Sequence, residues 1–313
     1  MLAAGAYLVV QQEVTAGVMI AATILLGRAL LPVETLVAGW RSLVEARGAW
    51  KRVRHSMDSF EGTSTTEVLP PPQGALEAER VVFGLPGRDV PLLRGVSFRL
   101  APGESLGIVG PSAAGKSTLA RVLIGVWRPA SGAVRLDGAD VAAWPRERLG
   151  PHIGYLPQDV ELLGGTVADN IARCSEPDPA DVIRAAERAG VHELVLRLPK
   201  GYETEVGEGG SALSAGQRQR IALARALYGN PRLVVLDEPN ASLDHEGERA
   251  LLGAVESLRK DGVTVVIIAH RPSLMRGIDK LLVLREGAVE AFGPCADIMR
   301  RVTRTGLAVR EVA

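Results

Sequence analysis

The hydrophobic and polar positions divide the chain into an apolar beginning and a long alternating remainder. Residues 2–10 are almost wholly apolar, and residues 14–27 contain no charge. Neither run by itself reaches the roughly 20 apolar residues that span a bilayer, but the second continues through a few polar positions to Trp40. The pattern alone leaves two alternatives for residues 14–40, a membrane helix and a buried core helix.

The charges around this segment favour the membrane helix. The turn at residues 11–13 carries no cation, whereas the stretch after Trp40 holds Glu45 and several cations, namely Arg41, Arg47, Lys51, Arg52 and Arg54. Basic flanks stay on the cytoplasmic side of a membrane, so we expect the following segment to be cytoplasmic. Residues 40–57 keep an apolar spacing typical of a helix, which predicts a cytoplasmic stalk.

No basic stretch precedes the first apolar run, so residues 2–10 do not resemble a signal peptide. They look instead like the cut end of an earlier membrane helix. This interpretation makes the chain the C-terminal part of a longer protein, or the product of a shortened gene model.

A proline-rich stretch separates this beginning from the rest of the chain. Residues 58–74 contain Ser, Thr and Gly together with three consecutive prolines at 70–72, which cannot continue a helix and act as a stiff spacer. We therefore expect residues 1–57 to be the remnant of a transmembrane domain, residues 58–74 to be a linker, and residues 75–313 to form a second domain.

From residue 75 onward, short apolar strands alternate with helical segments. This order is typical of an α/β fold with a mainly parallel sheet, here with an antiparallel β part at its N-terminal side. We expect helices to begin at Thr166, Ser214, Ser273 and at Asp178 followed by Pro179. The predicted strands are 76–83, 96–100, 105–109, 133–136, 153–156, 233–236, 263–269, 280–284 and 288–292.

Charge and cysteine content exclude some classes of function. The formal net charge is zero at pH 7, which gives no electrostatic reason to expect nucleic acid as a partner. The 2 cysteines, Cys174 and Cys295, are far apart and lack the spacing of metal ligands. A reduced, cytoplasmic setting is the simplest interpretation of such sparse cysteine.

The most specific motif is a glycine-rich loop at residues 110–118, between a predicted strand and a predicted helix. In this arrangement, backbone N–H groups of the loop wrap a β-phosphate, and Lys116 reaches the β- and γ-phosphate oxygens. Ser117 is expected to hold Mg²⁺ through its hydroxyl. The predicted nucleotide-binding residues here are Gly110, Ser112, Ala114, Gly115, Lys116, Ser117 and Thr118.

Two carboxylates follow the predicted strand 233–236. Parallel sheets place ligands beyond the carboxyl ends of their strands, so Asp237 can hold Mg²⁺ near the glycine-rich loop. Glu238 would then point toward the γ-phosphate and orient or deprotonate a water. A strand that ends in Asp-Glu is usually just a turn, and the loop around Lys116 is what favours a catalytic interpretation.

A second helix start with anion-binding character occurs at residues 213–217. Ser214 is expected to cap the helix, and its first N–H groups together with the helix dipole form a second anion site. One phosphate chain does not need two such sites far apart in one sheet. We infer that the second site serves a nucleotide held by another copy of the domain.

In combination, these motifs resemble those of the ATP-binding cassette (ABC) ATPases. Residues 110–118 look like Walker A, Gln158 like the Q-loop, 213–217 like the signature, 233–238 like Walker B, 242–244 like the D-loop, and His270 like the switch histidine. The resemblance implies a P-loop ATPase domain with a mixed sheet and a helical signature subdomain, working with ATP and Mg²⁺.

By the same resemblance, two such domains dimerise head to tail with ATP between Walker A of one and the signature of the other. Glu238, His270 and Gln158 would be catalytic. The metal ligands would be Ser117, Gln158 and Asp237. The partner's nucleotide would meet Ser214, Gly216 and Gln217, and Asp244 would also contact nucleotide.

Two positions depart from the family pattern. Ala215 stands where a second glycine is usual, and its methyl crowds the phosphate slightly while Gly216 keeps a close approach available. Leu85 stands at the position of the aromatic residue that stacks on adenine. Phe83 is a candidate substitute that we expect to face the core instead, which puts base stacking in doubt.

The kind of ABC protein is indicated by two further stretches. Residues 204–210 look like the X-loop that exporters place against their membrane domain, although an acidic solvated loop is an alternative. Residues 19–34 look like the last membrane helix of type I secretion ATPases, and residues 154–162 and 169–173 resemble the same group. Such proteins have six membrane helices, of which this chain contains only the last.

The narrower resemblance implies a location in the bacterial inner membrane with a cytoplasmic ATPase domain. It also implies a periplasmic membrane fusion protein, an outer-membrane channel and an exported polypeptide as partners. Three alternatives stay open: export of a lipid or small molecule, a regulatory nucleotide-binding module, and a soluble ATPase acting on DNA or ribosomes. The sequence disfavours the last two, because Glu238 and His270 are both present and no basic surface or second cassette is evident.

Overall fold

The computed structural model describes residues 2–60, 69–85, 87, 90–269, 272–275 and 277–305. The chain divides into two compact units, residues 1–64 and 65–313. Each unit is described by itself below.

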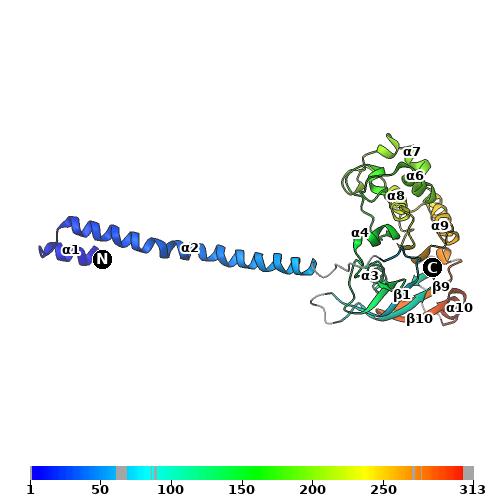
Figure 1. The fold of residues 1–313 in the computed structure, drawn as a ribbon, viewed down its shortest axis with the longest axis horizontal. Coiled ribbons are helices and arrows are strands. Elements are labelled where there is room, and N and C mark those ends of the chain that lie inside the picture. The colour runs from blue at the N-terminus through cyan, green and yellow to red at the C-terminus, as the bar shows by residue number, and fades with distance from the viewer. Residues whose placement is uncertain are drawn as a thin grey trace. The chain divides into compact units, whose positions relative to one another are not determined.

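The first unit is a pair of helices, α1 (Leu2–Val10) and α2 (Ala16–Phe60). Figure 1 shows α1 folded back along the start of α2. A Cβ on Gly5 would lie 2.7 Å from the Met19 side chain, so the glycine allows this close approach. The segment predicted as membrane helix and stalk is one continuous helix of 45 residues, with Pro32 inside it.

By length and composition, residues 16–54 could cross a membrane. None of the most apolar window of this helix is buried within the chain, whereas a core helix of a soluble domain is mostly buried. Of the two sequence-based alternatives, these properties fit the membrane helix.

The second unit contains two sheets. The four-stranded sheet is antiparallel, has the order β2-β1-β4-β5, and consists of β1 (Leu76–Phe83), β2 (Leu93–Leu100), β4 (Ser131–Leu136) and β5 (Ala139–Asp140). The six-stranded sheet has the order β10-β9-β3-β8-β7-β6. Its strands are β3 (Ser105–Val109), β6 (Ile153–Leu156), β7 (Leu233–Asp237), β8 (Thr264–Ile268), β9 (Lys280–Arg285) and β10 (Ala288–Pro294).

All strands of the six-stranded sheet are parallel except β10, which pairs antiparallel with β9. The expected mixed α/β architecture is therefore confirmed. The sequence pattern missed β5 and placed the start of β2 at Val96 instead of Leu93. Arg94 and Gly95 interrupt the apolar pattern there, but pairing of Phe83 with Leu93 extends the ladder.

Successive side chains of each strand point to opposite faces of the six-stranded sheet, so they pack into two separate hydrophobic clusters. Val235 and Ile268 face one cluster, which includes α3 (Lys116–Leu123) and the four-stranded sheet. Leu236 and Ile267 face the other cluster, with α5 (Val167–Ile171), α6 (Pro179–Arg188), α8 (Ala215–Leu227) and α9 (His245–Lys260). The helices α3 and α8 thus cover opposite faces of the sheet, and Figure 1 shows α6, α7 and α8 grouped at one end of the unit.

The remaining described helices are short, except α10 (Cys295–Thr305). They are α4 (Arg146–Leu149), α7 (His192–Leu196) and the 3₁₀ turns Gly150–His152, Gly201–Glu203, Glu208–Gly210 and Pro272–Met275. The predicted caps Thr166, Ser214 and Asp178 are confirmed. The predicted cap at Ser273 is wrong: this residue lies inside the 3₁₀ turn, which begins one residue earlier at a proline, a residue that favours the first helical position.

Candidate nucleotide-binding site

The glycine-rich loop connects β3 to α3 and depends on two of its glycines. Gly110 has φ 156° and Gly115 has φ 98°. A Cβ at Gly110 would lie 2.0 Å from the Leu284 carbonyl oxygen, and one at Gly115 would lie 3.0 Å from the Leu92 carbonyl oxygen. The main chain can follow this path only without side chains at these positions.

Lys116 lies at the centre of the loop. Its side chain is only 6% exposed, and Nζ donates to the carbonyl oxygens of Gly110 at 2.9 Å and Pro111 at 3.0 Å. The loop thus holds the ammonium group inside its own curve. Ser112 and Ala113 at the apex are exposed, while Ser117 and Thr118 are half-buried in the first turn of α3.

Two residues beside the predicted phosphate contacts have a strained backbone conformation, which the sequence did not predict. Ala113 has φ 63° and Glu238 has φ 48°, although neither is a glycine. A left-handed conformation costs an L-residue roughly 1–2 kcal/mol. Such outliers gather at functional sites, where the surrounding structure enforces them.

Asp237 is the last residue of β7 and is 1% exposed. Within the described part of the chain, neither oxygen of its carboxylate has a hydrogen-bond partner of good geometry. Burial raises the pKa of Asp237 above its ordinary value; the nearby Ser117 hydroxyl offsets part of this rise, and the charge of Glu238 adds to it. A buried carboxylate without a partner is costly unless a cation compensates it.

The Asp237 carboxylate and the Ser117 hydroxyl together are oxygen ligands that fit a divalent cation. Carboxylate and hydroxyl oxygens are the ligands that Mg²⁺ prefers, and Mg²⁺ usually takes only one or two protein groups together with phosphate oxygens. Among the described residues, no group of 3 or more His, Cys, Asp or Glu side chains is placed to hold a metal.

Gln158 and Glu238 meet at the same edge of the sheet. Gln158 follows β6, and its Nε2 donates to Glu238 Oε2 at 3.2 Å. The backbone N–H of Glu238 donates to the Ile268 carbonyl at the end of β8, at 2.9 Å. Because β8 lies between β3 and β7, the carboxyl ends of all these strands meet at one edge. His270 lies outside the described residues, so its catalytic role stays a prediction.

The predicted signature begins α8 with a capping box. The Gln217 N–H donates to Ser214 Oγ at 3.3 Å, and the Ser214 N–H donates to Gln217 Oε1 at 2.8 Å. Ala215 is the first helical residue. A Cβ on Gly216 would lie 3.0 Å from the Ser242 carbonyl oxygen, so the predicted signature and the predicted D-loop are packed closely.

Asp244 has partners within its own chain. It caps α9 by accepting from the Gly247 N–H at 2.8 Å, and both of its oxygens lie 3.2 Å from Arg220 Nη2. The Gly247 hydrogen bond lowers the pKa of Asp244; removal from water opposes this with a smaller rise, and the Arg220 charge adds a still smaller lowering. The side chain ties α9 to the signature helix, and a contact with nucleotide stays a prediction.

The adenine-stacking position is not taken over by Phe83. This ring is 8% exposed and stacks on Trp127, with centroids 5.0 Å apart and the two planes parallel. Phe83 therefore faces the core, as expected, and Leu85 is 38% exposed.

The predicted X-loop is paired to the start of α5. The Val167 N–H donates to the Thr204 carbonyl at 3.0 Å, and the Val206 N–H donates to the Gly165 carbonyl at 2.9 Å. Val206 is fully buried, whereas Glu205 and Glu208 are exposed. The stretch therefore has an anchored backbone and presents its acidic side chains outward.

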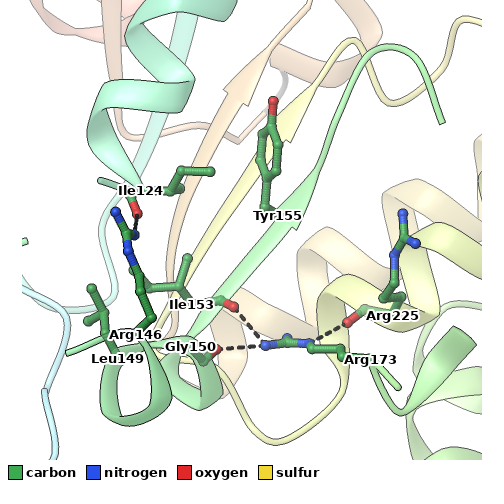
Figure 2. A pocket seen from close by; sticks show the side chains of 8 residues that line it. All are labelled: Ile124, Arg146, Leu149, Gly150, Ile153, Tyr155, Arg173 and Arg225. Carbon is green, nitrogen blue, oxygen red and sulfur yellow. Dashed lines mark hydrogen bonds between the residues drawn. The ribbon is translucent and has the colours of Figure 1, made fainter. Parts of the chain in front are cut away.

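A pocket of about 250 Å³ is lined by none of the predicted site residues. Figure 2 shows the side chains on its wall. Sequence reasoning missed Arg173, which lies on its wall. The Arg173 guanidinium donates to five carbonyls, those of Gly150, Ile153, Arg225, Ala226 and Tyr228, at 2.7–3.2 Å. Burial and the Arg225 charge lower the pKa of Arg173 to about 10. No periodicity marks such a residue, because its partners are main-chain atoms from distant segments.

The fold and the site define a P-loop nucleotide-binding domain. Residues 93–241 match the ABC transporter family, so the chain carries an ABC transporter ATPase domain. It is 47% identical over 313 residues to the type I secretion system ATP-binding protein PrsD of Rhizobium meliloti, covering 100% of this chain and 54% of that protein.

Two other relatives agree with this assignment. The chain is 37% identical over 292 residues to the cyclolysin secretion/processing ATP-binding protein CyaB of Bordetella pertussis, covering 92% of this chain and 41% of that one. A solved bacterial Atm1-family ABC exporter with ATP bound is similar with a TM-score of 0.74 and 32% identity, covering 95% of this chain and 52% of that one. The chain thus spans about half the length of the relatives it matches.

Proposed function

We propose that this chain binds and hydrolyses ATP with Mg²⁺ and couples the reaction to export of a polypeptide across the bacterial inner membrane. The observation that carries the proposal is the convergence of Lys116, Asp237, Glu238 and Gln158 at one edge of the sheet, in a chain similar to type I secretion ATP-binding proteins. Export of a lipid or small molecule is not favoured by these relatives.

Each group of residues has its own role in ATP hydrolysis. Backbone N–H groups of the glycine-rich loop and Lys116 bind the β- and γ-phosphates. Ser117, Asp237 and the amide oxygen of Gln158 would hold Mg²⁺, which neutralises phosphate charge when bound. Glu238 orients and deprotonates the attacking water, and His270 bridges the γ-phosphate to Glu238.

A second copy of the chain supplies the signature. The helices α3 and α8 cover opposite faces of the sheet, which supports a nucleotide shared between Walker A of one copy and Ser214, Gly216 and Gln217 of the other. Closure of this dimer would act on the membrane helices through Gln158 and the loop at 204–210. Residues 14–40 would lie in the inner membrane, with the ATPase domain in the cytoplasm. A periplasmic membrane fusion protein and an outer-membrane channel would complete the route.

The shared site is tested by the dependence of ATP hydrolysis on protein concentration. For the wild-type chain in detergent, the rate per molecule should rise with concentration, because dimerisation completes each site. The variant Ser214→Arg should lose this rise. Ser131→Arg adds the same charge at an exposed position of β4 and is the matched control. A concentration-independent rate that survives Ser214→Arg would contradict the shared site.

The role of Glu238 is tested by Glu238→Gln. This variant should bind ATP and accumulate as a dimer while turnover falls at least about 100-fold, because the amide cannot accept the proton of water. Turnover at the wild-type rate would remove Glu238 from the role of base.

A further inference from the structure

Tyr155 lies on the same face of the six-stranded sheet as Asp237. It pairs with Val235 of β7 in parallel register, and both side chains pack in the cluster that includes α3. Asp237 follows Val235 by two residues, so its side chain points to that face as well. Strands about 4.8 Å apart with a rise of about 3.3 Å per residue put the Cα atoms of Tyr155 and Asp237 about 8 Å apart. An aromatic side chain reaches across such a diagonal.

The Tyr155 hydroxyl is buried within range of two opposite charges. Among the described residues, its oxygen has no hydrogen-bond partner of good geometry. Burial raises the pKa of Tyr155, the charge of Asp237 adds to this rise, and the Arg121 guanidinium opposes it. Figure 2 shows Tyr155 on the wall of the pocket of about 250 Å³, with its hydroxyl directed away from Arg173. The ring therefore belongs to the pocket wall, whereas the hydroxyl belongs to the surroundings of Asp237.

Arg121 is fixed in place by an aromatic ring. It lies on α3 one helical turn beyond Ser117, on the same face of the helix. Its guanidinium lies over the Trp127 ring, 4.8 Å from the centroid, and this ring is itself stacked in the core. Burial raises the pKa of Asp237, and the Arg121 charge is one of the groups that offset this rise. Arg121, Tyr155 and Asp237 therefore gather where α3 faces the ends of β6 and β7.

We propose that Tyr155 is a positioning residue for the Asp237 carboxylate. Its O–H donates to one Asp237 oxygen and leaves the other to the metal, while its own oxygen accepts from the Arg121 guanidinium. A phenol has one proton to donate and lone pairs to accept, so it can serve both neighbours at once. The inference rests on the proposed function, in which Asp237 is a ligand of Mg²⁺.

A hydrogen bond of this kind affects the metal more than the fold. Carboxylates that bind a metal are held in orientation by outer hydrogen bonds, and loss of such a bond typically costs about 10–100-fold in metal affinity or activity. The hydroxyl should contribute little to stability without nucleotide, because it lacks a partner of good geometry among the described residues. The inference therefore predicts a loss that depends on the presence of Mg²⁺.

The first experiment measures equilibrium binding of the non-hydrolysable β,γ-imido analogue of ATP to the full chain in detergent, with Mg²⁺ and with EDTA. Tyr155→Phe should weaken binding about 10-fold in Mg²⁺ and leave binding in EDTA unchanged, because only the metal ligand loses its support. Tyr202→Phe is the matched control. It removes a hydroxyl that lies 2.8 Å from His192 Nδ1 in the cluster on the opposite face of the sheet, and it should change neither affinity.

Three results would contradict these expectations. Unchanged binding of the analogue to Tyr155→Phe in Mg²⁺, or an equal loss in Mg²⁺ and in EDTA, would overturn the inference. The melting temperature of the nucleotide-free variant should stay within about 2 °C of wild type, and a larger fall would assign the hydroxyl to the fold instead. A wild-type chain that binds the analogue no better in Mg²⁺ than in EDTA would contradict the proposed function, so the two failures are distinguishable.

The second experiment tests whether Arg121 acts through the phenol. Arg121→Lys keeps the positive charge but loses the planar donor group. It should weaken binding in Mg²⁺ several-fold by itself and add no further loss to Tyr155→Phe, because two residues in one network are not additive. Arg249→Lys makes the same change at an exposed position of α9 and should have no effect. Additive losses in the double variant would overturn the route from Arg121 through Tyr155.

Discussion

The glycine-rich loop and the signature both lead into a helix, but the two helix starts are prepared differently. The cap position of α3 is Gly115, in a left-handed conformation and without a side-chain cap. The cap position of α8 is Ser214, joined to Gln217 in a reciprocal capping box. Near the start of α3, Lys116 is buried and Ala113 has a strained positive φ. At the start of α8, Ser214 and Ala215 are exposed.

This difference indicates a division of labour. The start of α3 leaves its N–H groups to be satisfied by phosphate oxygens, so it is complete only with a ligand. The start of α8 is stable within its own chain and presents Ser214 and Ala215 on the surface, with Gly216 half-buried beside them. A preformed surface of this kind suits a second contact to a nucleotide that another copy already holds.

Removal of the loop's cation should have the largest effect. We expect Lys116→Ala to reduce turnover at least about 100-fold, since a buried charge directed at developing phosphate charge is lost. The measurement is steady-state phosphate release at saturating Mg²⁺–ATP. Lys260→Ala removes an exposed lysine from α9 and should retain activity. Equal losses in both variants would contradict the special role of the loop.

Neutralising Asp237 should lower the activity of the protein but raise its stability. We expect Asp237→Asn to lose turnover about 100-fold because the metal loses its protein carboxylate. Burial raises the folded pKa of Asp237, so the ionised form costs stability at neutral pH, and this cost disappears as pH falls through that raised pKa.

Without Mg²⁺–nucleotide at pH 7, the Asp237→Asn protein should therefore melt at a higher temperature than wild type. The difference in melting temperature between the two proteins should become smaller toward acidic pH. Thermal melts across pH make the measurement, with Asp261→Asn, at an aspartate that is half exposed, as control. A lower melting temperature at pH 7 would contradict the burial penalty.

The signature start allows a comparison of two matched caps. Ser214→Ala and Thr166→Ala each remove the hydroxyl of a capping box, and each should cost about 1 kcal/mol in urea unfolding. Only Ser214→Ala should also reduce, several-fold, the rise in hydrolysis rate per molecule with protein concentration. Thr166 should not affect this rise, because it is paired with the predicted X-loop instead. A similar kinetic change in both variants would mean that helix stability alone explains it.

The smallest effect concerns strain in the loop. Ala113→Gly should stabilise the protein by about 1 kcal/mol, because glycine adopts a positive φ without cost while losing some chain entropy. Ala114→Gly should destabilise it, since Ala114 is 3% exposed and is not among the residues with positive φ. Urea unfolding compares the two, and stabilisation by both or by neither would contradict a strain specific to Ala113.

Much of this site was accessible from local sequence. Glycine at 110 and 115 followed by lysine predicts a phosphate loop, and Ser214 before an apolar helical pattern predicts a helix cap, because each depends on neighbours in the chain. The failures are also local in origin. Arg94 and Gly95 concealed the start of β2, and a proline before Ser273 began a turn one residue earlier than expected.

The sequence by itself determined the alternation of strands and helices, the long apolar segment at 14–40, and the order of the glycine-rich and acidic motifs, since periodicity and spacing are local properties. Only the tertiary structure decided that α3 and α8 cover opposite faces of one sheet, that the Asp237 carboxylate is buried beside Ser117, and that Arg173 joins five carbonyls. These features arise when segments far apart in the chain are packed together, and that packing sets burial, charge and reach.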